Sequence, residues 1–171
     1  MEQPKIVKCG LGTIQEPQKI LLDNKVPLYK FNAGDEEIVQ IDFTFDAGEI
    51  KSVLPMVAPV TNMMLKEGTI RMKAEELNEK LDFYGILFSL FCSNDKAGIS
   101  LFCLNKYLEN ALDLVSDMLI QPLFEEKELT TLLGKQKNEF LISRDIVGVL
   151  AKESFFSNIF GNDHPYGRIR E

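Results

Sequence analysis

Residues 37–46 alternate between two sets of side chains, and this alternation restricts the possible folds more than any other segment does. Successive side chains of a β-strand point to opposite faces of a sheet. A period of two with one wholly apolar set therefore predicts a strand that lies with one face against a core. The apolar set, which should face that core, is Val39, Ile41, Phe43 and Phe45.

Two hairpins are predicted by pairs of apolar-rich runs that short turns separate. Residues 18–22 and 26–31 flank the turn at 23–25, and residues 86–92 and 98–104 flank the turn at 93–96. Proline cannot donate a hydrogen bond to a strand ladder, so Pro27 places the second run at a sheet edge or at the start of a strand.

Helices are predicted at residues 52–65, 73–84, 107–120, 125–144 and 149–159. Pro55 suits the first turn of the first helix, whereas Pro59 should kink that helix or delay its start. Strands in pairs followed by a run of helices favour an α+β fold, mainly an antiparallel sheet covered by helices on one side. The apolar face predicted for residues 107–120 comprises Leu108, Ala111, Leu112, Val115, Met118 and Leu119.

Composition indicates a soluble protein and excludes some partners. The length of 171 residues suits one domain or a large piece of one. The 19 basic and 26 acidic side chains give a net charge of −7, which opposes binding to a nucleic-acid backbone. No run is apolar and long enough to span a membrane. Because a chain whose export signal has been removed would begin in a similar way, the sequence does not decide between a periplasmic and a cytoplasmic location.

The cysteines and aromatic residues are most simply interpreted as core residues. The three cysteines, Cys9, Cys92 and Cys103, contain no CxxC pair. Cys92 and Cys103 could face each other on neighbouring strands, although the sequence does not establish a disulfide. The aromatic residues predicted to be buried are Phe83, Tyr84, Phe88, Phe91 and Phe102.

Several short motifs occur in order along nearly the whole chain, and the order is more specific than any single motif. An Asp-Ala-Gly-Glu turn follows the alternating strand, a Leu-Lys-Glu-Gly-Thr run closes the first helix, and a His-Pro-Tyr-Gly-Arg run lies near the end. The full set occupies residues 46–49, 65–69, 75–77, 84–85, 93–95, 108–114, 121–124 and 164–168.

Taken together, these motifs resemble the N-terminal domain of the pitrilysin/insulinase family of zinc peptidases, peptidase family M16. The resemblance implies a metallopeptidase domain that normally continues beyond this length, so we expect residues 1–171 to be a single, truncated part of such a domain. It also implies that substrate binds as an added strand on a sheet edge beside the metal helix.

The resemblance places the inverted zinc motif, His-x-x-Glu-His, on the helix predicted at residues 52–65. Counting back from Gly68, the two histidine positions hold Pro59 and Met63, and the general-base position holds Asn62. The third ligand, a glutamate from a later helix, corresponds to Glu139, which lies 139 − 63 = 76 residues after Met63. Proline has no ligand atom, and a thioether binds zinc poorly. We therefore expect no catalytic residues, a vestigial ligand position at Glu139 and no bound zinc.

Two other sites are possible but less favoured. His164 is the only histidine in the chain, so no alignment can build a site with two histidines. Glu67, Glu139 and His164 are candidates for an unrelated metal site. Cys92 or Cys103 with His164 would make a nucleophilic dyad, but no local motif supports it.

Three functions are consistent with these observations. The favoured one is a catalytically inactive M16-type domain, the non-catalytic half or subunit of a clamshell zinc protease. The resemblance then implies an active M16-type subunit or second domain as partner, with a peptide as substrate. A true zinc peptidase with ligands elsewhere is opposed by the single histidine. The third function is a peptide- or protein-binding scaffold domain that has no peptidase partner.

Overall fold

The computed structural model describes residues 15–168, and the chain divides into two compact units, residues 1–36 and 37–171. The described part of the first unit is an antiparallel hairpin of β1 (Gln18–Leu21) and β2 (Pro27–Lys30). Pro27 is the first residue of β2, as predicted. In the turn between the two strands, Asn24 Oδ1 accepts a hydrogen bond from the N–H of Val26 at 3.1 Å. That residues 1–171 form part of one family domain stays a prediction.

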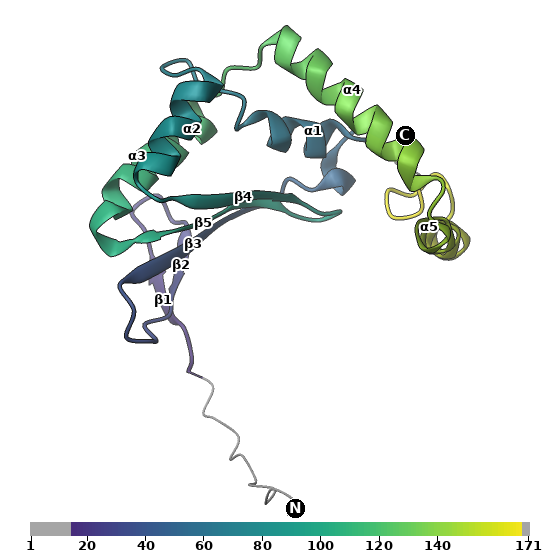
Figure 1. Ribbon diagram of the computed structural model, residues 1–171. Helices are drawn as coiled ribbons and strands as arrows, with labels where there is room; N and C mark the ends of the chain where they lie inside the picture. Colours follow the sequence, from purple (N-terminus) through teal and green to yellow (C-terminus); the bar gives the residue numbers. More distant parts are fainter. Residues whose placement is uncertain (1–14, 169–171) are drawn as a thin grey trace, which may run out of the picture. The chain divides into compact units, whose positions relative to one another are not determined.

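The second unit is built on a three-stranded antiparallel sheet with the strand order β3-β5-β4 (Figure 1). These strands are β3 (Ile38–Phe45), β4 (Leu87–Cys92) and β5 (Ala97–Leu104). The first three residues of the apolar set predicted on β3 pack against the core, whereas Phe45, at the strand end, is 44% exposed. In the register with β5, Val39 lies opposite Cys103, Ile41 opposite Leu101 and Phe43 opposite Ile99.

Helices cover one face of this sheet, as predicted, and the fold is α+β (Figure 1). The covering helices are α1 (Val57–Met64), α2 (Ala74–Phe83) and α3 (Leu108–Ile120). Two single-turn 3₁₀ segments, η1 (Glu49–Lys51) and η2 (Asn105–Tyr107), precede α1 and α3. The helices α4 (Glu126–Ser143) and α5 (Val147–Phe160) follow. Within residues 15–168, no helix is long and apolar enough to cross a bilayer.

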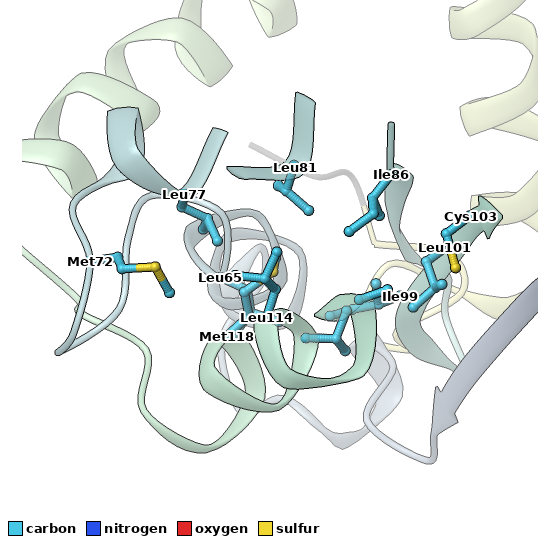
Figure 2. Close-up of a cluster of buried hydrophobic side chains, with 12 residues drawn as sticks. Leu65, Met72, Leu77, Leu81, Ile86, Ile99, Leu101, Cys103, Leu114 and Met118 are labelled. Atoms are coloured by element: carbon cyan, nitrogen blue, oxygen red, sulfur yellow. The ribbon is translucent and has the colours of Figure 1, made fainter. Parts of the chain in front are cut away.

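The core lies between the sheet and the helices α2 and α3 (Figure 2). Leu77 on α2 and Ile99 on β5 are both 0% exposed. Burial of such a side chain stabilises the fold by about 1.5–3 kcal/mol. The prediction for the apolar face of α3 was wrong at one position. Leu112, which was predicted to face the core, is 38% exposed, and Leu114, at 6% exposed, lies in the core instead. The apolar stripe is therefore rotated toward Leu114 relative to the predicted one.

Two of the five aromatic residues predicted to be buried are exposed, and the other three, Tyr84, Phe88 and Phe91, are only partly buried. Phe83 is 79% exposed at the end of α2, and Phe102 is 43% exposed because it lies on the sheet face opposite the helices. The idea that Cys92 and Cys103 face each other was also wrong. Cys92 lies opposite Ala97, whereas Cys103 lies near the other end of β5 and is buried. Cys9 lies outside the described residues.

Three of the motifs found in the sequence meet at one end of the sheet. Gly48 donates its N–H to Asp95 O at 3.2 Å, in the turn between β4 and β5. A Cβ atom on Gly48 would lie 2.3 Å from the Asp95 carbonyl carbon, so only glycine fits this approach. The Tyr166 hydroxyl donates to the Asp95 carboxylate and ties the His-Pro-Tyr-Gly-Arg segment to the same turn. The order of the motifs thus reflects contacts between distant segments.

The Gly-Thr motif after α1 has a similar physical basis. Gly68 has a φ of 118°, which disfavours other residues. Thr69 is 1% exposed, and its Oγ1 accepts the N–H of Met72 at 3.1 Å. Leu123 donates its N–H to Gly68 O at 3.0 Å, which joins this turn to the Gln-Pro segment after α3. These bonds fix the end of α1 relative to the start of α4.

Candidate functional site

The first wall of the site is α1, whose start is set by a proline. The helix begins at Val57 rather than at residue 52, so Pro59 is its third residue. The N–H groups of the first turn have no partner within a helix, so a proline there breaks no bond. The first bond of the usual i→i−4 type joins Val60 N–H to Met56 O at 2.9 Å. The prediction that Pro59 delays the helix is confirmed.

A buried carboxylate holds the residue before this helix. Met56 adopts a φ of 66°, which is uncommon for a residue other than glycine. Glu49 is only 6% exposed, and its Oε1 accepts the N–H of Met56 at 3.2 Å. A negative charge is also favourable beside the positive end of a helix dipole. The sequence showed Glu49 only as part of a turn motif and gave no sign of this role.

Asn62 fastens α1 to the sheet. Its side chain is 7% exposed, and Nδ2 donates to Phe91 O at 2.8 Å and to Gly98 O at 3.4 Å. Phe91 and Gly98 lie opposite each other on β4 and β5. The amide at the expected general-base position is thus turned toward the backbone as a donor. Sequence reasoning missed this contact, because nothing local to α1 indicates it.

The second wall is one face of α4. Gln136 lies three and four residues before Glu139 and Phe140, and Ser143 lies three and four residues after Phe140 and Glu139, so the four share a side of the helix. Gln136 Nε2 donates to Glu139 Oε2 at 3.0 Å. The carboxylate of Glu139 is solvent-exposed. It is therefore able to meet a bound group without a change in the fold.

These walls and the end of β4 enclose a cleft of about 580 Å³, within the usual range for ligand sites. The structure brings Pro59, Asn62 and Met63 on α1 into the same cleft as Glu139 on α4, although 76 residues separate Met63 from Glu139 (139 − 63). That these are degenerate catalytic and metal positions stays a prediction. The full lining is Met56, Pro59, Asn62, Met63, Leu90, Phe91, Cys92, Gln136, Glu139, Phe140 and Ser143.

Residues 57–141 match the family model of insulinase, peptidase family M16. This segment runs from the first residue of α1 to α4 and contains every expected site position. The chain belongs to peptidase family M16. Comparison with curated proteins gives no match.

The M16 assignment agrees with a solved structure. The chain superimposes with a TM-score of 0.85 on the crystal structure of a peptidase M16 inactive domain from Pseudomonas fluorescens, at 23% sequence identity. The match covers 91% of this chain and 38% of that one, so this chain spans under half of its length. At this identity the likeness shows the shared fold.

Zinc is the metal that the M16 family implies, and the residues at the expected ligand positions do not fit it. A zinc site needs about four N, O or S ligands. Pro59 supplies none, and the Asn62 Nδ2 group is engaged as a donor to Phe91 O. Met63 supplies only a thioether, which leaves the carboxylate of Glu139 as the one strong ligand at the expected positions.

The two less favoured sites gain no support from this M16 domain. Among residues 15–168, no group of three His, Cys, Asp or Glu side chains could hold a metal ion. His164 packs its ring against Phe160, with 5.4 Å between centroids, and its Nδ1 accepts the N–H of Tyr166 at 3.2 Å. Burial raises the pKa of the Cys103 thiol, which disfavours the reactive thiolate.

Proposed function

We propose that this chain is a catalytically inactive M16-type domain that binds peptide beside an active M16-type partner, either a subunit or a second domain. Its part would be that of the non-catalytic half of a clamshell zinc protease, and it would carry no zinc. The observation that supports the proposal is the cleft, which brings Pro59, Asn62 and Met63 together with Glu139, the positions that we assign to the family's site.

The cleft supports a binding role because it lies beside a sheet edge. Strand β4 is an outer strand of the described sheet, and its residues Leu90, Phe91 and Cys92 line the cleft. An extended peptide can add to such an edge through main-chain hydrogen bonds and place alternate side chains in neighbouring pockets. This mode of binding needs backbone groups and a cleft but no metal. Loss of zinc ligands is therefore compatible with retained peptide binding.

A partner role is supported by family membership and by the similar Pseudomonas fluorescens structure, which is that of an inactive domain. For an inactive half to take part in proteolysis, a second half must supply the metal. The alternative is a peptide- or protein-binding scaffold domain with no peptidase partner. The cleft suits both functions, so the partner decides between them.

Co-purification from the source cell tests the partner role. We expect the full chain, captured from that cell, to bring down a chain that carries an intact His-x-x-Glu-His motif. Adding this chain to the purified partner should increase cleavage of an unfolded peptide. Repeated capture without any motif-bearing chain would favour the scaffold. An active partner whose cleavage rate is unchanged by this chain would contradict the proposed role.

A further inference from the structure

The cleft between α1, β4 and α4 has an uneven charge distribution. Its walls are largely apolar, with Met63, Leu90 and Phe140 contributing, and no Lys or Arg is among the lining residues. Glu139 is the only Asp or Glu among them. The lining therefore offers one carboxylate and no basic side chain that could neutralise it from within the cleft.

The carboxylate of Glu139 is only lightly engaged. Gln136 Nε2 donates to one of its oxygens at 3.0 Å. Across the part of the chain that the structure describes, no ion pair within 4.0 Å includes Glu139. Arg144, a nearby cation in sequence at the end of α4, pairs with Glu153 instead. The charge on Glu139 is thus available to a ligand.

From this juxtaposition we infer that the cleft selects an extended peptide that carries an arginine side chain. The guanidinium would pair with Glu139, and the methylene stem would lie along the apolar wall at Met63. Phe140, beside Glu139 in the lining, already carries the Arg144 guanidinium 5.7 Å from its ring centroid, so this wall accommodates a planar cation but the ion pair with Glu139 has to supply the selectivity. This inference rests on the proposed peptide-binding function and specifies its ligand. In it, Glu139 serves as the recognition residue for a cation.

Arginine fits this arrangement better than an apolar or an acidic side chain does. An apolar side chain would displace water from the exposed Glu139 carboxylate and offer no cation in return, which costs free energy. An acidic side chain would be repelled by the same charge. The volume of about 580 Å³ exceeds that of one side chain, so backbone next to the arginine can also enter beside β4.

Fluorescence anisotropy with the full chain tests the inference. The probe is an eight-residue labelled peptide with one central arginine among neutral residues, and its matched control replaces that arginine with citrulline, a neutral side chain of nearly the same shape. We expect the arginine peptide to bind about twofold to fivefold more tightly, the size expected of one partly exposed ion pair. The difference should shrink as salt rises.

Two variants locate the effect. Glu139→Gln should bind both peptides with the affinity that the wild-type chain shows for the citrulline peptide. Glu128→Gln, on the same helix but outside the cleft lining, should keep the full preference. Circular dichroism of each variant confirms the fold. Competition by methylguanidinium, which should displace the arginine peptide from the wild-type chain, gives a readout that does not depend on any variant.

Each outcome has a distinct meaning. Equal binding of the two peptides by the wild-type chain would overturn the arginine inference and leave the peptide-binding function intact. A preference that survives Glu139→Gln would also overturn it, because the cation would then be recognised elsewhere. Failure of both peptides to bind would contradict the peptide-binding part of the proposed function as well.

Discussion

Replacing Asn62 with aspartate tests whether this side chain holds α1 against the sheet. The change keeps the size of the side chain and removes its N–H donors. In the native chain Nδ2 donates to Phe91 O at 2.8 Å and to Gly98 O at 3.4 Å, and Asn62 is only 7% exposed. In the variant a carboxylate oxygen would face these two carbonyl oxygens. The contacts that fasten the helix would become repulsive.

The cost follows from the loss of two donated bonds. Loss of a buried hydrogen bond of this kind costs about 1–3 kcal/mol, and burial of the new charge beside two carbonyl oxygens adds to this. We therefore expect Asn62→Asp to lower the free energy of unfolding at pH 7 by about 3 kcal/mol or more. For a protein of this size, 3 kcal/mol corresponds to a fall in Tm of about 6–12 °C.

The pH dependence separates this mechanism from general damage. The two carbonyls should raise the pKa of the introduced carboxyl group in the folded variant above its unfolded value of about 3.9. A group with a raised folded pKa is most favourable to folding when protonated, below the unfolded pKa. The stability deficit relative to the wild-type chain should therefore be largest above the raised pKa and shrink as the pH falls through it.

Thermal unfolding followed by circular dichroism between pH 4 and 8 measures both effects. The matched control is Asn138→Asp, which makes the same chemical change at an exposed position on α4. This control should change Tm by little at any pH. Equal behaviour of the two variants, or a deficit for Asn62→Asp that does not depend on pH, would refute the role given to Asn62.

Three other outcomes are expected. Gly98→Ala should prevent folding or cost several kcal/mol in chemical denaturation, because its Cβ would lie 2.0 Å from Phe43 O, and near-normal stability would contradict the close packing. Leu77→Ala should cost about 2–5 kcal/mol, whereas Leu112→Ala, at a position 38% exposed, should cost much less; equal losses would contradict the assigned core face. The hydrogen bond to Asp95 raises the pKa of Tyr166. The stabilising effect of this hydrogen bond is therefore present below about pH 10 and is lost as the pH rises through the raised pKa. Ultraviolet titration should show that pKa falling in Asp95→Asn, and an unchanged titration would argue against this contact.

The strands and helices were predictable because their signals are local. The alternation of residues 37–46 identifies β3, and Pro59 predicts a delayed start of the helix α1, which begins at Val57. The buried face of α3 was harder to predict, because Leu112 and Leu114 are both apolar and lie on either side of the stripe. Only packing against α2 and β5 decides which of the two is covered.

The cleft could be anticipated from the spacing of Glu139 relative to the α1 positions, through the likeness to a known family. The role of Asn62 could not be anticipated, because its hydrogen-bond acceptors lie 29 and 36 residues away on two strands. Burial of Glu49 escaped prediction for a similar reason, since its partner Met56 follows seven residues later in an unusual conformation. Side chains that bond to distant backbone leave no periodic signal in a sequence.

The most direct test of the account is the zinc content of the purified full chain. After incubation with zinc and removal of the excess, elemental analysis should find far less than one zinc per chain, and an unfolded peptide should remain uncleaved. One zinc per chain together with cleavage that a chelator abolishes would contradict the account, because it would show a working metal site despite Pro59, Asn62 and Met63.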